Sequence, residues 1–226
     1  MWLSNPKART LIGLVCTLAL LHFVSSHLLA LALLLLVWHR VFSPLQPSDV
    51  TLFAISALVF LVQDYICLKA GVFEFRSKDF MLMPYYEPFL WGFYFLSLKR
   101  FVVGYSEQRV PIGKKAVVGF AVSSTVFSLF SGKSAILTLA TLGSSALLLI
   151  LFHERRDLQF ALSALVLGFI VELFGVSTGL WFYPNPDFLG IPYWFATMWL
   201  SVGLLGYRFM IPLAEWISGR FEFYRA

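Results

Sequence analysis

The sequence is poor in charged residues. Only 13% of its 226 residues are Asp, Glu, Lys or Arg, while 59% are hydrophobic and the mean hydropathy is +0.81. A soluble domain has about a quarter of its residues charged, and a core of this size cannot bury so much apolar surface. The bilayer is therefore the predicted solvent of the chain. The net charge of +5 is then expected to orient the chain in the membrane, and it indicates no nucleic-acid partner.

The sequence also lacks the motifs of several catalytic centres. It has no glycine-rich phosphate loop and no Gly-x-Ser-x-Gly motif. Its four histidines are scattered without metal-ligand spacing, so we expect no metal site and no cofactor. The only cysteines, Cys16 and Cys67, lie inside apolar runs and are predicted to be buried free thiols rather than a disulfide.

What the sequence has instead is a series of long apolar segments, which predict an all-α polytopic membrane protein of about eight helices. The segments span about residues 10–25, 28–45, 50–69, 81–99, 115–131, 134–152, 158–180 and 190–212. The breaks at 25–27 and 131–133 are short, so six or seven helices are alternatives. With the N-terminus inside, 13 of the 17 lysines and arginines lie on the inner side. This bias favours eight spans, with both termini cytoplasmic.

The second half of the chain resembles the first. Residues 64–101 and 172–209 align without gaps at an offset of 108, with nine identities in 38 positions. The identical pairs are Gly71/Gly179, Asp79/Asp187, Phe80/Phe188, Pro84/Pro192, Tyr85/Tyr193, Trp91/Trp199, Leu96/Leu204, Arg100/Arg208 and Phe101/Phe209. Since each half has an even number of helices, we predict two tandem four-helix repeats in parallel orientation. The predicted parts are a first repeat (9–101), a basic cytoplasmic linker (102–114), a second repeat (115–212) and a cytoplasmic tail (213–226).

Three acidic residues lie where apolar helices approach the outer surface. Asp64 ends the run "TLFAISALVFLVQD", and Glu172 ends the equivalent run of the second half. Glu87 follows in "PYYEPFLWGFYF", one turn into the fourth predicted helix, and its equivalent is Phe195. A carboxylate inside a membrane is costly and usually faces the bundle interior or a wet cavity. These acids are candidate catalytic groups, although each could instead cap backbone or bind a neighbouring helix.

Aromatic residues surround these acids in the sequence, and we predict that they form the wall of a binding pocket. The candidates are Phe73, Tyr86, Trp91, Trp181, Tyr183, Trp194 and Trp199. An aromatic belt at the membrane interface is the alternative for Trp181 and Tyr183. Other repeated residues have local interpretations: N-caps for Asp79 and Asp187, inner-surface anchors for Arg100 and Arg208, and C-caps for Gly71 and Gly179.

A neutral carboxylic acid in an aromatic pocket is suited to protonating a carbon–carbon double bond. The aromatic faces stabilise the carbocation that forms, and a second carboxylate removes a proton or orients a water. Glu87 and Glu172 are the candidate acids, and Asp64 is the candidate base.

The stretches "DYICLKAGVFEFRSKDFMLMPYYEPFLWGFYF" and "ELFGVSTGLWFYPNPDFLGIPYW" resemble the repeat of the integral-membrane lycopene cyclases and related carotenoid-biosynthesis proteins. The resemblance implies a cyclase, isomerase or hydratase acting on an isoprenoid or polyene substrate from the bilayer, alone or as a homo- or hetero-oligomer. The family has two adjacent glutamates where this chain has Tyr86 and Glu87. The alternatives are a small transporter, a lipid-binding protein or a non-catalytic subunit.

Overall fold

The apolar segments form helices in the computed structural model, which describes residues 5–105, 111–130 and 132–223. The elements are α1 (Pro6–Phe23), α2 (His27–Phe42), α3 (Pro47–Lys69), β1 (Glu74–Phe75), α4 (Glu87–Val102), α5 (Lys114–Phe130), α6 (Ser134–Leu151), α7 (Arg155–Thr178), β2 (Trp181–Phe182), α8 (Trp194–Leu205), a π-helix (Gly206–Met210) and α9 (Ile211–Phe223). Within the described residues, five helical stretches are long and apolar enough to cross a membrane. The predicted all-α class is confirmed.

The fourth and eighth predicted helices begin later than expected, at Glu87 and Trp194. The residues before them form tight turns closed by the bridges Phe80–Met83 and Phe188–Ile191. Met81, Leu82 and Leu189 have positive φ angles in these turns, which is incompatible with a right-handed helix. The last helix also continues past 212 to Phe223, through the π-helix.

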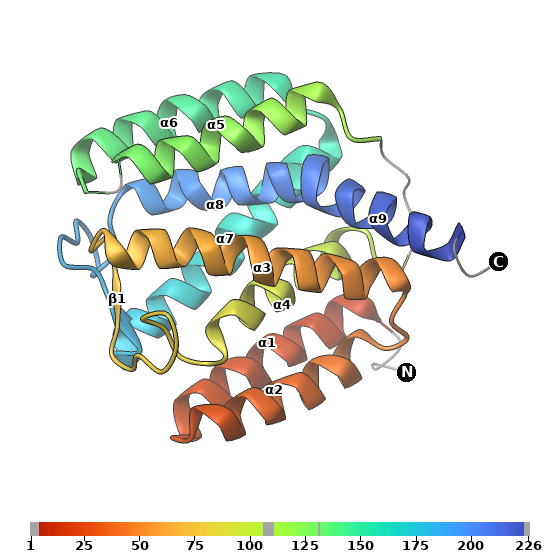
Figure 1. The fold of residues 1–226 in the computed structure, drawn as a ribbon, viewed down its shortest axis with the longest axis horizontal. Coiled ribbons are helices and arrows are strands. Elements are labelled where there is room, and N and C mark those ends of the chain that lie inside the picture. The colour runs from red at the N-terminus through yellow and green to blue at the C-terminus, as the bar shows by residue number, and fades with distance from the viewer. Residues whose placement is uncertain (1–4, 106–110, 131, 224–226) are drawn as a thin grey trace.

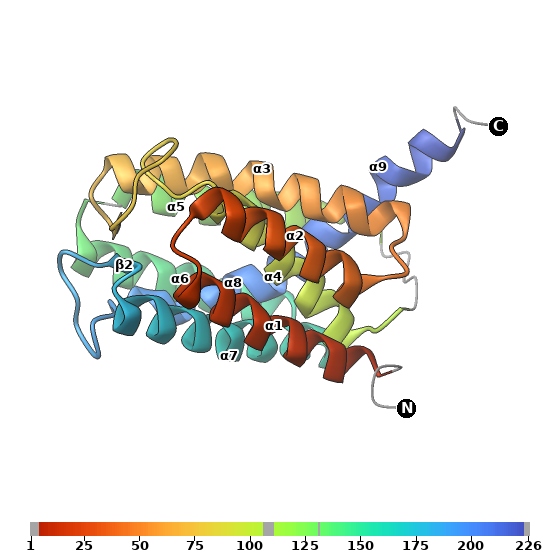
Figure 2. The ribbon, with the colours of Figure 1, turned by 90° about the horizontal axis from the view of Figure 1, so that it is seen from below.

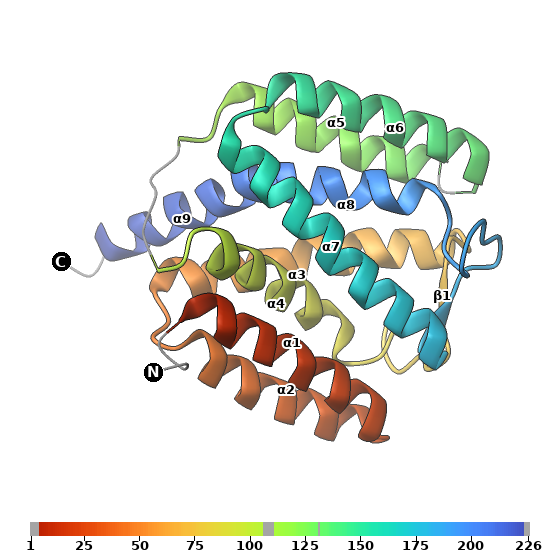
Figure 3. The ribbon, with the colours of Figure 1, turned by 180° about the vertical axis from the view of Figure 1, so that it is seen from behind.

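The helices form a core flanked by two hairpins. α3, α4, α7 and α8 lie in the middle, and the hairpins α1–α2 and α5–α6 cover opposite sides of them (Figure 1). The views from below and from behind show the same order (Figures 2 and 3). The start of α1 and the end of α9 lie at one end of the bundle, and the two short strands lie at the other. We call these the terminal end and the strand end.

The two strands pair with each other across the two halves of the chain. β1 and β2 are antiparallel, and Glu74 lies opposite Phe182. These two residues are 108 positions apart, which is the offset of the sequence alignment. Gly71 and Gly179, which precede the strands, both have a φ of 69° and end α3 and α7 as expected. Equivalent segments therefore meet at the strand end.

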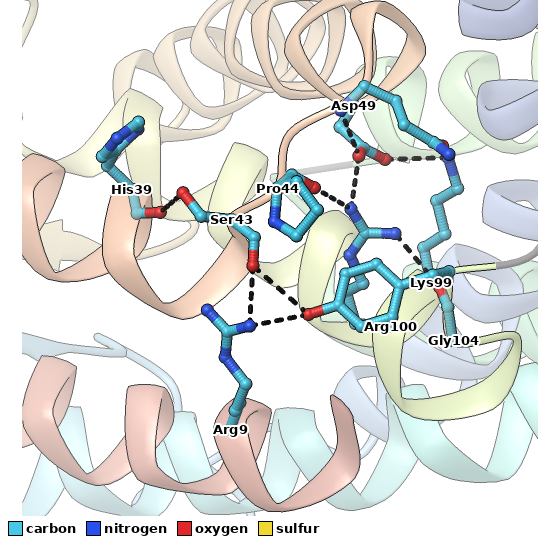
Figure 4. Close-up of polar contacts among 10 residues, drawn as sticks. Arg9, His39, Ser43, Pro44, Asp49, Lys99, Arg100 and Gly104 are labelled. Carbon is cyan, nitrogen blue, oxygen red and sulfur yellow. Dashed lines mark hydrogen bonds and ion pairs between the residues drawn. The ribbon is translucent and has the colours of Figure 1, made fainter. Parts of the chain in front are cut away.

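At the terminal end, the first half contains a buried ion cluster. Asp49 of α3, which is fully buried, accepts hydrogen bonds from Arg100 and, at 2.9 Å, from Nζ of Lys99. Figure 4 shows both cations of α4 directed at this carboxylate. The prediction of Arg100 as a surface anchor is wrong, because its side chain is buried against α3.

The second half repeats this arrangement with one cation. Asp157 of α7 accepts hydrogen bonds from Nε and Nη2 of Arg208, at 2.6 and 2.7 Å. Arg208 also pairs with the exposed Glu154 at 2.9 Å. Asp49 and Asp157 each bind the backbone N–H three residues earlier, at 3.0 Å, in a capping box. Each aspartate thus starts one helix and ties it to the next.

We predict that Asp49→Asn destabilises the protein more than Asp157→Asn. Loss of the Asp49 carboxylate leaves two buried cations, and breaking a buried ion pair costs about 3–5 kcal/mol. Arg208 is less buried and keeps its ion pair with Glu154, so the loss of stability in Asp157→Asn is smaller.

Detergent-induced unfolding followed by circular dichroism measures the free energy of unfolding of both variants. The exposed pair Glu74–Lys78 supplies a control, since Glu74→Gln is expected to change stability by about 1 kcal/mol or less. Equal losses at the two aspartates would contradict the prediction.

Candidate functional site

A cavity of about 130 Å³ lies between α3, α4, α5, α7 and α8. The three acids predicted from the sequence, Asp64, Glu87 and Glu172, all line it, and each side chain is more than nine-tenths buried. Of the aromatic candidates, the ones on its wall are Phe73, Trp91, Trp181, Tyr183, Trp194 and Trp199. Among the residues that line the cavity there is no lysine, arginine or histidine.

Tyr86 is the one candidate that does not line the cavity. It is buried just before α4, with its ring edge-on to the ring of His27 at a centroid distance of 5.7 Å. His27 in turn contacts Asp79 at 2.5 Å. Asp79 and Asp187 accept the backbone N–H of Tyr85 and Tyr193, at 3.3 and 2.8 Å, and so hold the turns before α4 and α8. Asp79 and Asp187 thus help to position α4 and α8, and Tyr86 lies outside the cavity lining.

Asp64 is held by an indole. Nε1 of Trp91 donates a hydrogen bond to Oδ2 of Asp64 at 2.6 Å, which links the end of α3 to α4. The ring of Trp91 stacks on Phe60 at 3.9 Å and on Trp199 at 5.4 Å. Trp91 and Trp199 are equivalent in the two halves, so the halves meet again in the cavity wall. Trp91 therefore both fixes one acid and joins the two halves.

Glu172 is held by two donors from the strand end. Nε1 of Trp181 and the hydroxyl of Tyr183 each donate to Oε2 of Glu172 at 2.8 Å. Burial, and secondly the adjacent Glu172, raise the pKa of the Tyr183 phenol well above its usual value. Tyr183 is therefore a neutral donor at physiological pH. Both aromatic residues are buried, so an interfacial belt does not describe them.

Two glycines of α7 make room for the indoles. A Cβ at Gly175 would lie 2.0 Å from Cζ2 of Trp181, and a Cβ at Gly168 would lie 2.4 Å from Cδ2 of Trp199. The two glycines are seven residues apart and so lie on the same face of α7. The sequence contains this signal, since small residues in a membrane helix mark close packing.

Glu87 differs from the other two acids because part of it has no partner. Its Oε2 atom is buried at the cavity without a hydrogen bond. Nε1 of Trp199 is also buried without a partner at hydrogen-bond distance, although it lies close enough to Glu172 to interact with that carboxyl group. Buried polar atoms are almost always paired, and an unpaired one costs about 1–3 kcal/mol. Oγ of Ser123, which also lines the cavity, is buried without a partner as well. The cavity thus offers a free carboxylate acceptor, a free indole donor and a hydroxyl group that can do either.

Sequence reasoning missed two parts of the wall. α5 contributes Phe120, Ser123, Ser124 and Phe127, although it belongs to a hairpin with no predicted site residue. The π-helix contributes Gly206 and Met210. In it, the N–H of Ile211 bonds to the carbonyl of Gly206, five residues earlier. The following Pro212 has no N–H to donate, and this proline was the available signal. Single-turn π-helices are frequent at functional sites.

Comparisons with known proteins give a likeness in structure alone. No protein-family model matches the chain, and no curated protein matches its sequence. The fold is similar to the crystal structure of MvINS, a mycobacterial Insig homologue from Mycobacterium vanbaalenii, with a TM-score of 0.64 and 18% identity, covering 74% of this chain and 94% of that chain. A cross-linked trimer of an MvINS variant matches with the same values.

The predicted membership of the lycopene cyclase family is wrong, because the solved structures that share this fold are those of an Insig homologue. The expectation of carotenoid biosynthesis, with cyclase or isomerase activity, rested on that resemblance and loses its basis. The assignment as a membrane protein does not depend on that resemblance, because it rests on the hydrophobic helices and on the shared fold. This chain is an integral, multi-pass membrane protein with the fold of an Insig homologue.

Proposed function

We propose that this protein is a non-catalytic membrane protein that binds a lipid-soluble ligand in the cavity lined by Asp64, Glu87 and Glu172. The observation that carries the proposal is a set of unpartnered atoms in an aromatic cavity: Oε2 of Glu87, Nε1 of Trp199 and Oγ of Ser123. A ligand whose polar group bonds to these atoms offsets the cost of burying them.

Two of the three free atoms, one acceptor and one donor, indicate the polar group of the ligand. Oε2 of Glu87 is an open acceptor and the indole N–H of Trp199 is an open donor. A hydroxyl group satisfies both, since it donates one hydrogen bond and accepts others. A pure hydrocarbon, such as an unsubstituted polyene, satisfies neither. The ligand class is therefore a lipid alcohol, with its hydroxyl between α4 and α8.

The remaining acids and aromatic residues act as the fixed surroundings of this group. Asp64 is held by Trp91 at 2.6 Å, and Glu172 is held by Trp181 and Tyr183 at 2.8 Å. Their donors come from separate elements of the chain, so the wall is set before a ligand arrives. A cavity of about 130 Å³ receives the hydroxyl and the carbons next to it. The rest of the ligand extends toward the bilayer, past the half-buried Phe73 and Phe127.

We further propose that the two halves, 9–101 and 115–212, are tandem repeats joined by the linker 102–114 and followed by the tail 213–226. The support is the recurrence of contacts at an offset of 108. Asp49–Arg100 matches Asp157–Arg208, and the strand pair and the Trp91–Trp199 stack each join equivalent residues. Eight spans with cytoplasmic termini follow from this arrangement and from the positive-inside bias.

The ligand proposal predicts that the protein prefers a lipid alcohol to its hydrocarbon analogue. Geranylgeraniol and the hydrocarbon that lacks its hydroxyl are the probes, and quenching of tryptophan fluorescence is the readout, because Trp91, Trp181, Trp194 and Trp199 line the cavity. We expect the alcohol to bind about ten- to a hundredfold more tightly. Glu87→Leu is expected to reduce the preference to a few-fold, since it removes the free acceptor and leaves the indole donor of Trp199.

Glu74→Gln is the control for this measurement. Glu74 forms an ion pair with Lys78 at 2.7 Å, and neither residue lines the cavity. It should keep the preference of the wild type. Equal binding of the two probes by the wild type would refute the hydroxyl assignment. Absence of binding by both probes, with a folded protein, would refute the cavity as a lipid site.

The topology proposal predicts the accessibility of single cysteines in a background without Cys16 and Cys67. Gly132→Cys and Asn185→Cys, both at exposed positions of the strand end, should react with an impermeant maleimide from outside the cell. Lys114→Cys, at an exposed position of the terminal end, should react only after permeabilisation. Labelling of residues 132 and 185 from opposite sides would rule out the eight-span arrangement.

A further inference from the structure

A second cavity, of about 270 Å³, lies between α5 and α6. It is at the terminal end of the bundle, where α5 begins and α6 ends (Figure 1). Its walls are aliphatic side chains of both helices: Val118, Val122, Leu147, Leu148 and Leu151. Val118 and Leu147 are 61% and 49% exposed, so the cavity is a groove on the outer surface of the hairpin.

The groove follows from how the hairpin packs. α5 approaches α6 at Gly119, where a Cβ would lie 2.8 Å from Cδ2 of Leu148. Because Gly119 has no side chain, nothing from this position fills the space between the flanking valines and leucines. The exposed aliphatic walls face the hydrocarbon of the bilayer in a membrane protein. A flexible acyl chain matches such walls in both polarity and shape.

The end of the groove at the start of α5 carries positive charge. Lys114 and Lys115 line it at the first turn of α5, and both are exposed. Among the described residues, no carboxylate forms an ion pair with either lysine. Asp157 and Glu154 at this end are bound to Arg208, and Asp49 is bound to Lys99 and Arg100. The groove therefore presents two uncompensated positive charges directly above an apolar channel.

We propose that this groove is a binding site for an anionic phospholipid, with an acyl chain between α5 and α6 and its phosphate at Lys114 and Lys115. The argument is charge complementarity, because a zwitterionic lipid carries a compensating cation and gains less from two lysines. A soluble anion would use the lysines but leave the aliphatic groove to be filled by other lipid. The site is separate from the central cavity and does not depend on its ligand.

The experiment measures lipid retention by native mass spectrometry. The full chain is reconstituted in nanodiscs of equal parts phosphatidylglycerol and phosphatidylcholine, released, and its bound lipids are counted. We expect phosphatidylglycerol to be retained in preference. Each lysine near a membrane surface contributes about fivefold to the binding of an anionic lipid, so Lys114→Gln with Lys115→Gln should weaken retention roughly thirtyfold.

Two further variants separate the groove from general electrostatics. Lys69→Gln with Lys133→Gln makes the same change in net charge at the strand end and should leave retention unchanged. Val118→Trp keeps both lysines but fills the groove, and it should reduce retention of phosphatidylglycerol. Equal loss in the two double variants would overturn the site in favour of bulk charge. Full retention by folded Val118→Trp protein would overturn the role of the groove.

Discussion

The bilayer offers a buried charge no water, so each buried acid of this chain has to find its partner inside the protein. Five carboxyl groups are buried among the described residues, and their partners divide them into two groups. Asp49 and Asp157 are bound by the cations of α4 and of the π-helix that follows α8. Asp64 and Glu172 accept hydrogen bonds from neutral donors, and Oε2 of Glu87 has no donor at all. This division makes the terminal end a structural clamp, whereas the acids of the cavity have no cation to pair with among the residues that line it.

The position of the cavity follows from how the two halves of the chain meet. Where equivalent segments of two similar halves contact each other, equivalent residues face one another. Trp91 stacks on Trp199 at 5.4 Å, and Glu74 lies opposite Phe182. The acids of α3 and α7 thereby come to one central space. The halves then differ in one decisive place, because Glu87 has Phe195 as its equivalent. The first half therefore supplies the unpaired acceptor, and the second half has an apolar side chain at the equivalent position.

The sequence predicted the helices and a third of the cavity wall, including its three acids, for clear physical reasons. Long apolar runs form helices in a membrane, and an acid such as Glu172 within one is too costly to face lipid. Contacts between distant segments could not be predicted from the sequence. No pattern in the neighbouring residues indicates that Asp49 binds Arg100, which lies 51 residues later. The cyclase resemblance failed for a related reason. Gly71 ends a helix and Asp79 holds the next turn, and these tasks recur in unrelated proteins that turn at a membrane surface.

The hydrogen bonds of the cavity also favour binding over acid-initiated chemistry. A general acid must direct a proton at its substrate, whereas the resolved bonds of Asp64 and Glu172 show their oxygens accepting from indole and phenol groups. Among the three acids, Glu87 alone has a free oxygen, and this acceptor beside the indole N–H of Trp199 suits the hydroxyl group of the ligand that we propose. In the proposed complex, the same aromatic walls that would stabilise a carbocation enclose the ligand and exclude water from its polar group.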